Sequence, residues 1–176
     1  MIFLSAGHYP SRPGAGFEGF FEHDEAMLWA VRIHASLCGV SCIVPAGVLK
    51  EKIAFINNRL DGNDFALEIH FNSAKDNDGK HIGRGCETLY YPGSKTGEPF
   101  AQAINDAMAK HMEPNRGIKE GWYRMNKDNG PDFFLARTAC PAIIIEPDFI
   151  HRKKRIQDAR EACCIEIAKA LKQEIM

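Results

Sequence analysis

Hydrophobic and polar positions follow two periods along the chain. Short apolar runs of the kind typical of buried strands occupy 2–6, 40–44, 65–70, 86–91 and 142–146. Longer stretches, with apolar residues every three or four positions, predict amphipathic helices at 24–37, 49–60, 100–108 and 156–175. Alternation of strand and helix is typical of layered α/β domains. We therefore predict one α/β domain over 1–176, with a mostly parallel or mixed twisted sheet of about six strands and helices on both faces.

Three stretches between these elements are predicted to be loops. The segment from Tyr9 to Gly19 has two prolines and three glycines, and Ala74 to Gly85 is polar and contains glycine. The segment from Asn115 to Ala139 has no clear period and is interpreted as a rim loop with a short strand. In the helix that follows the first loop, one face is expected to be buried, and it comprises Met27, Ala30, Val31, His34 and Leu37.

Bulk composition excludes several classes of protein. A net charge of −1 and a pI of about 6.6 give no field that favours nucleic acid or an anionic membrane surface. No apolar run is long enough to span a bilayer, and no basic leader precedes the first strand. We expect synthesis in the cytoplasm without a signal peptide. The six cysteines lack metal-binding spacing and are expected to be reduced thiols, mostly in the core.

Four side chains capable of metal chemistry are expected at one rim of the sheet. His8, His70 and Glu146 each end a predicted strand, and Glu22 lies at the start of the first helix. The carboxyl ends of parallel strands form the edge at which α/β sheets bind ligands. Two imidazoles and one carboxylate are the ligand set of a catalytic zinc site, and the remaining carboxylate is then free for proton transfer. Glu25, one helical turn beyond Glu22, is a weaker alternative to it.

Seven motifs in order along the chain carry a family resemblance. They are Ser5-Ala-Gly-His8, Glu22-His-Asp24, Asn58-Arg59, Glu68-Ile-His-Phe-Asn-Ser73, Gly85-Cys-Glu-Thr-Leu-Tyr-Tyr91, Arg116-Gly-Ile-Lys119 and Pro141-Ala-Ile-Ile-Ile-Glu146-Pro-Asp-Phe149. Together they resemble the zinc-dependent N-acetylmuramoyl-L-alanine amidases that have a glutamate between two zinc histidines. The family pattern has serine where Glu68 stands here.

The resemblance implies one zinc ion per chain, bound by His8, Glu22 and His70, with Glu146 as the catalytic glutamate. It also implies peptidoglycan as the substrate, cut between N-acetylmuramic acid and L-alanine. Asn72 and Glu87 are candidates for supporting the site or contacting substrate. Arg59 is expected to support the fold or the site through a charge-assisted hydrogen bond and to take no part in the chemistry.

Other functions remain open at this stage. A zinc carboxypeptidase that acts on the stem peptide would use similar chemistry, and product analysis separates it from an amidase. A non-catalytic wall-binding module would need a broken site, which the sequence does not indicate. We favour an endolysin-like enzyme of phage or prophage origin, without a separate wall-binding domain, over a cytoplasmic recycling enzyme. The basic run 152–155 is interpreted as a solvated helix start rather than a wall contact.

Overall fold

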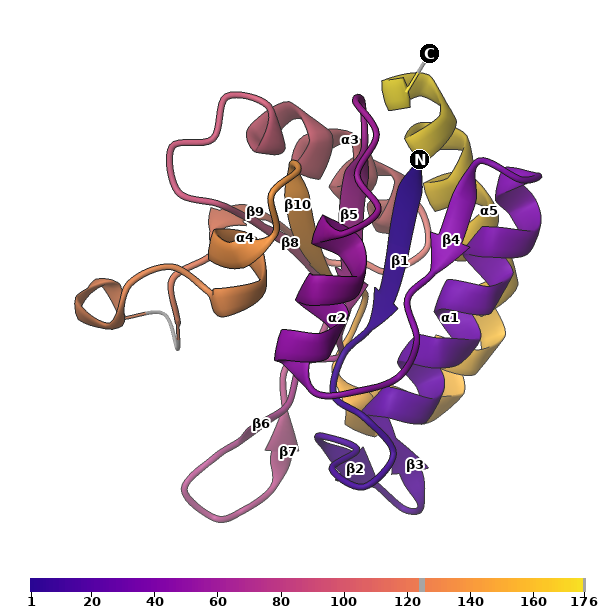
Figure 1. Ribbon diagram of the computed structural model, residues 1–176. Coiled ribbons are helices and arrows are strands. Elements are labelled where there is room, and N and C mark those ends of the chain that lie inside the picture. Colours follow the sequence, from indigo (N-terminus) through magenta and orange to yellow (C-terminus); the bar gives the residue numbers. More distant parts are fainter. Residues whose placement is uncertain (124–125, 176) are drawn as a thin grey trace.

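The computed structural model describes residues 1–123 and 126–175 and has a six-stranded sheet in the order β4-β1-β5-β10-β8-β9 (Figure 1). Its strands are β1 (Ile2–Ala6), β4 (Ser41–Ile43), β5 (Phe65–Ile69), β8 (Cys86–Tyr90), β9 (Asn115–Glu120) and β10 (Ala142–Glu146). All neighbouring pairs are parallel except β10 with β8. The predicted mixed, mostly parallel α/β sheet is therefore confirmed.

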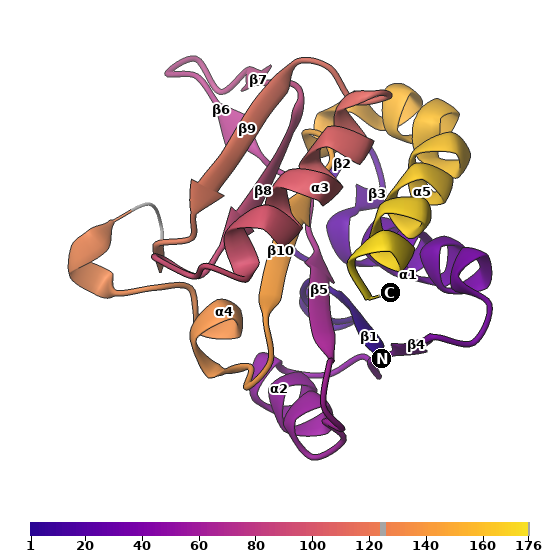
Figure 2. The same ribbon diagram turned by 90° about the horizontal axis from the view of Figure 1, so that it is seen from above.

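Helices cover both faces of this sheet (Figure 2). They are α1 (Glu22–Leu37), α2 (Leu49–Asn57), α3 (Gly97–Ala109), α4 (Phe133–Arg137) and α5 (Lys153–Ile175). Helices α1, α3 and α5 bury one core with Leu67 and Ile69, while α2 and α4 bury a second core with Phe3 and Ala66. Neighbouring residues of β5 belong to different cores because side chains alternate across a strand.

The predicted buried face of α1 is partly wrong. Ala30 and Leu37 are buried as expected, but Val31 is 44% exposed, and the centre of the packed stripe is Trp29 and Ile33. Helix α1 lies against β1 and α5 together. It therefore buries a stripe rotated from the one that spacing alone suggested, with the largest side chain, Trp29, innermost.

Short hairpins occupy two of the predicted loops. Strands β2 (Gly16–Phe17) and β3 (Phe20–Phe21) pair within and just after the first loop, and β6 (Ala74–Lys75) pairs with β7 (His81–Ile82) in the second. Both hairpins project from the lower edge of the sheet in Figure 1, where β1 and β5 end. The unclear segment 115–139 contains β9 and α4, and its residues 124 and 125 lie outside the described chain.

All six cysteines are free, and Cys86, Cys163 and Cys164 are buried while Cys38 is exposed. The expected reduced thiols are therefore present, although half of them lie outside the buried core. Within the described residues, no helix combines the length and apolar character needed to cross a bilayer.

Candidate active site

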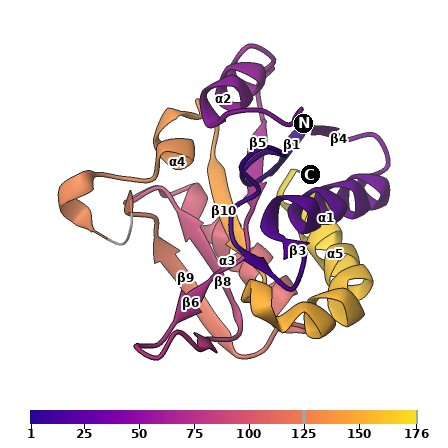
Figure 3. The same ribbon diagram turned by 90° about the horizontal axis from the view of Figure 1, so that it is seen from below.

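Three predicted metal ligands meet at the edge of the sheet viewed in Figure 3. His8 follows β1 after Gly7, His70 follows β5 directly, and Glu22 is the first residue of α1. Strands β1 and β5 are parallel neighbours, so their carboxyl ends deliver the two histidines side by side. The β2–β3 hairpin then returns the chain to the same edge, where α1 begins.

The Glu22 carboxylate joins the two imidazoles. His8 Nε2 lies 3.1 Å from Glu22 Oε2, and His70 Nδ1 lies 2.8 Å from Glu22 Oε1. One nitrogen from each ring and one carboxylate oxygen all lie within 4.8 Å of one another. Two nitrogens and one oxygen at such separations fit a zinc ion that keeps a further position for water or substrate.

The backbone fixes Glu22 in this position. The amides of Ala15 and Phe71 donate to its two oxygens, at 3.0 and 3.1 Å. Gly14 has φ +77°, and a Cβ there would lie 2.4 Å from His8 Cδ2 and 2.5 Å from Glu22 Oε2. A side chain at position 14 would therefore displace both candidate ligands. Gly14 thus lets the backbone lie close to His8 and Glu22, and Ala15 donates one hydrogen bond to Glu22.

The Glu22 carboxylate and the His70 imidazole shift each other's pKa values toward the charged forms. Burial alone raises the pKa of Glu22, but hydrogen bonds and charges from His70 and His8 outweigh it and hold that pKa far below its usual value. Burial lowers the pKa of His70, yet contacts with Glu22 and Glu68 raise it well above the usual value for histidine. The cluster therefore favours positive charge on His70, between the carboxylates of Glu22 and Glu68.

Glu68 is a site residue to which the sequence analysis assigned no role. Its Oε2 lies 3.3 Å from His70 Nε2, the nitrogen on the far side of the ring from Glu22. Glu68 is 3% exposed, and its Oε1 accepts from Ser5 Oγ at 3.1 Å and lies 3.4 Å from Lys52 Nζ. The available signal was the spacing of two between Glu68 and His70, which places both side chains on one face of β5.

Glu146 lies beside this cluster at the end of β10. The preceding residue, Ile145, accepts a hydrogen bond from the His70 amide at 2.9 Å, so the two side chains leave adjacent parallel strands at one level. Glu146 Oε2 is buried and has no hydrogen-bond partner within the part of the chain that the structure describes. Burial raises the pKa of Glu146 to about 7, with Glu22 and Glu87 adding to the rise and His70 opposing it. An unpartnered carboxylate of this kind is suited to exchanging a proton.

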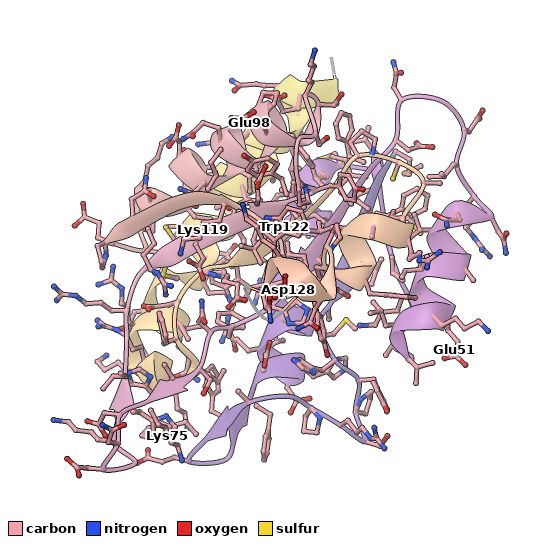
Figure 4. The ribbon with its side chains drawn as sticks, turned by 90° about the vertical axis from the view of Figure 1, so that its left-hand side faces the viewer. Glu51, Lys75, Glu98, Lys119, Trp122 and Asp128 are labelled. Atoms are coloured by element: carbon pink, nitrogen blue, oxygen red, sulfur yellow. The ribbon has the colours of Figure 1, made fainter. Side chains whose placement is uncertain are left out.

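A polar network continues the rim beyond Glu146. Glu87, the cross-strand neighbour of Glu146, accepts from Asn72 Nδ2 at 2.7 Å. Its other oxygen contacts Lys119 Nζ and lies 3.0 Å from Arg116 Nη2. Figure 4 places Lys119 and Trp122 over the β9 end of the sheet, with Glu51 of α2 at the opposite edge of that view. At this end of the rim, one carboxylate therefore faces two cations.

The alternative ligand Glu25 does not join the cluster. Both of its oxygens accept from the Arg160 guanidinium, at 2.6 and 2.7 Å, and Trp29 Nε1 donates to it at 2.8 Å. This buried pair links α1 to α5 and is a structural contact.

Arg59 also has a structural contact. Its Nη1 donates to the Phe55 carbonyl at 3.2 Å, and its guanidinium lies 3.8 Å from the centre of the Phe55 ring. The charged donor, two residues beyond the end of α2, thus meets a backbone oxygen and an aromatic face of that helix.

A cavity of about 620 Å³ lies away from these residues, at the start of α5. The basic run contributes to its lining, and three of its four cations are paired with carboxylates of the chain. Arg152 and Arg155 lie 3.4 and 3.3 Å from the buried carboxylate of Asp148, and Lys154 lies 2.8 Å from Asp158. Two side chains of the run that was predicted to be solvated are therefore paired with a buried carboxylate. We assign the cavity no role.

Comparison with known proteins identifies the family. No curated protein sequence matches the chain. Among solved structures, an N-acetylmuramoyl-L-alanine amidase from Clostridium difficile 630 is 19% identical, with 98% of this chain and 94% of that chain covered and a TM-score of 0.80. The catalytic domain of CwlV, such an amidase from Bacillus (Paenibacillus) polymyxa, is 20% identical, with coverages of 98% and 96% and a TM-score of 0.77. The catalytic domain of the CD27L endolysin, described as targeting Clostridia difficile, is 21% identical, with coverages of 99% and 98% and a TM-score of 0.73.

At these identities the structures establish the fold. The family model for N-acetylmuramoyl-L-alanine amidase matches residues 2–175, and the chain therefore belongs to that family of hydrolases.

Proposed function

We propose that the protein is a zinc-dependent amidase that cleaves peptidoglycan between N-acetylmuramic acid and L-alanine, with one zinc ion per chain. The observation that carries the proposal is the His8–Glu22–His70 cluster beside Glu146, whose buried Oε2 has no hydrogen-bond partner among the described residues. Family membership supplies the substrate class. The proposed ligands are the three residues of the cluster, and the proposed proton-transfer group is Glu146.

In this proposal each residue has a distinct task. Zinc, when bound, polarises the amide carbonyl and makes water a nucleophile near neutral pH. Glu22 and His70 keep their ligand atoms in place through the backbone amides and carboxylate contacts described above. Glu146 takes a proton from the attacking water and passes it to the nitrogen of L-alanine as the carbon–nitrogen bond breaks. The products are the free lactyl carboxylate of the sugar and the free amine of the peptide.

Metal analysis combined with mass spectrometry of digested peptidoglycan tests this function. We expect about one zinc per chain, and stem peptides that begin with a free L-alanine. A zinc carboxypeptidase would instead release single amino acids from intact muropeptides, and family membership does not favour it. Release of amino acids without free stem peptides would contradict the proposal. Amidase products from protein that has been freed of all metal would contradict its zinc dependence.

We also propose that the enzyme acts as a wall-degrading, endolysin-like protein after its release from the cytoplasm. The fold shared with the catalytic domain of an endolysin is compatible with this role. The rival role is recycling of soluble wall fragments inside the cell. Rates on insoluble wall sacculi and on soluble muropeptides separate the two roles. Rapid clearing of sacculi supports the lytic role, and activity confined to soluble fragments contradicts it.

A further inference from the structure

We propose that Glu68, held in place by Lys52 and Ser5, is the positioning residue that orients His70 toward the metal. The inference deepens the proposed function and rests on it, because it concerns a ligand of the proposed zinc site. It assigns a role to a buried glutamate that is neither a proposed zinc ligand nor the proposed proton-transfer group.

The two oxygens of Glu68 have separate partners. Oε2 lies 3.3 Å from His70 Nε2. Oε1 accepts from Ser5 Oγ at 3.1 Å and lies 3.4 Å from Lys52 Nζ. The carboxylate plane is therefore fixed from one side and presents its free oxygen to the imidazole. An imidazole that donates from Nε2 to a carboxylate offers its Nδ1 lone pair to a metal, and such outer carboxylates commonly orient metal-binding histidines.

The surrounding backbone permits this arrangement and restricts others. Ser5 and Glu68 are directly paired residues of the parallel strands β1 and β5. Lys52 reaches across from α2 and also donates to the carbonyl of Ala6. The His70 ring lies against Gly7, where an added Cβ would be only 2.5 Å from the ring carbon Cε1. His70 is thus confined by Gly7, by Glu22 at Nδ1 and by Glu68 at Nε2.

Burial makes Glu68 and Lys52 depend on each other. Each is 3% exposed, and a buried carboxylate without a nearby cation is strongly disfavoured. Serine at position 68 would need no such cation. We infer that Lys52 is present to neutralise Glu68, and that Glu68 is present to accept from His70. The pair is a positioning device of this chain, separate from the proton transfer assigned to Glu146.

Zinc affinity, measured by competition with a chromophoric chelator, tests the role of Glu68. We expect Glu68→Gln and Glu68→Ser to bind zinc about 10–100-fold more weakly than the unmodified protein. Glu25→Gln is the matched control, because Glu25 is equally buried and also paired with a cation but does not contact the site. It should lower the melting temperature without changing zinc affinity. Unchanged zinc affinity in both Glu68 variants would overturn the inference.

A double substitution separates positioning from general destabilisation. Lys52→Met alone should lower the melting temperature of the zinc-free protein, because it removes the lysine cation that faces the buried Glu68 charge. The double variant Lys52→Met with Glu68→Ser should recover most of the lost melting temperature. Its zinc affinity should still be about 10–100-fold weaker than that of the unmodified protein. If the double variant recovers both stability and full zinc affinity, Glu68 does not position His70. If the unmodified protein binds no zinc, the proposed function fails together with this inference. Tight zinc binding by the unmodified protein and by both Glu68 variants would overturn this inference alone.

Discussion

Glu22 and Glu25 lie one turn apart on α1 and are similarly buried, with exposures of 4% and 1%. Their partners differ in kind. Glu25 is bonded to the guanidinium of Arg160 and the indole of Trp29, which belong to the packed interior between α1 and α5. Glu22 is bonded to two imidazoles and two backbone amides at the rim of the sheet.

This difference teaches that burial of a carboxylate does not distinguish a functional site from a structural one. The charge of Glu25 is neutralised permanently, because arginine does not lose its proton in proteins. The charge of Glu22 faces histidines, whose nitrogens can bind either protons or a metal ion. Glu22 therefore faces partners that can exchange a proton for a metal ion, whereas the partner of Glu25 cannot, and the following substitutions test that contrast.

The largest effect is expected from Glu22→Gln. The amide is nearly isosteric but neutral, so the cluster loses the charge that would hold zinc between two imidazoles in the proposed site. We expect near-complete loss of zinc and of amidase activity, as for His70→Ala. Elemental analysis of the purified variants measures their zinc content. Zinc retained in Glu22→Gln and lost in Glu25→Gln would reverse the comparison.

Gly14→Ala should have the next largest effect. The new Cβ would overlap both His8 and Glu22, in a backbone conformation that costs alanine about 1–2 kcal/mol. We expect zinc affinity to fall by at least about 10-fold, as for other losses of ligand support. Gly19→Ala is the matched control, since Gly19 has φ +73° in the same region and no atom within 4 Å of an added Cβ. Equal zinc affinities in the two variants would contradict the claim that a side chain at position 14 displaces His8 and Glu22.

Glu25→Gln should change stability and leave the site intact. Breaking a buried ion pair costs about 3–5 kcal/mol, and we expect about 2 kcal/mol because glutamine keeps some hydrogen bonds and Arg160 retains contact with water. The side chain of Arg160 is 19% exposed. For a chain of this length the melting temperature should fall by about 4–8 °C, measured by calorimetry on the zinc-loaded and zinc-free protein. An unchanged melting temperature would mean that the pair does not stabilise the packing of α1 on α5.

The smallest effect is expected from Arg59→Lys. Lysine keeps the charge near Phe55 but loses the planar contact with the ring, which is worth about 0.5–1 kcal/mol at an exposed site. We expect a slight loss of stability and no change in turnover per folded molecule. An equally stable variant with abolished turnover would contradict a structural role for Arg59.

The sequence predicted the centre of the sheet better than its edge. Strands β1, β5 and β10 are apolar runs buried on both faces, and their limits agree with the prediction to within one residue. Strand β9 is the polar run Asn115–Glu120 at the sheet edge, where one side of the strand meets solvent and no apolar period is required. The face of α1 could not be assigned fully, because packing against α5 is a contact between distant parts of the chain.

The candidate site shows a similar limit. His8, His70 and Glu146 could be predicted because each follows or ends an apolar strand. Glu22 could be predicted because it begins the first helix and the motif Glu22-His-Asp24. Lys52 gave no such signal, since a lysine within an amphipathic helix normally extends into water. For Glu68, the spacing of two from His70 was the available signal. Their burial is visible only when the two opposite charges are seen to meet across the α2–β5 interface.

Glu146→Gln gives the most direct test of the central claim that three residues bind zinc and a fourth transfers the proton. Glutamine preserves the size of the side chain but cannot accept a proton, so we expect a folded protein with a full complement of zinc. Its amidase rate should fall by about 10²–10⁴-fold, the usual contribution of a general acid–base group. Zinc content and rate are measured on the same preparation. Zinc kept with the rate lost is the predicted result, and loss of zinc would make Glu146 a metal ligand and contradict the assignment.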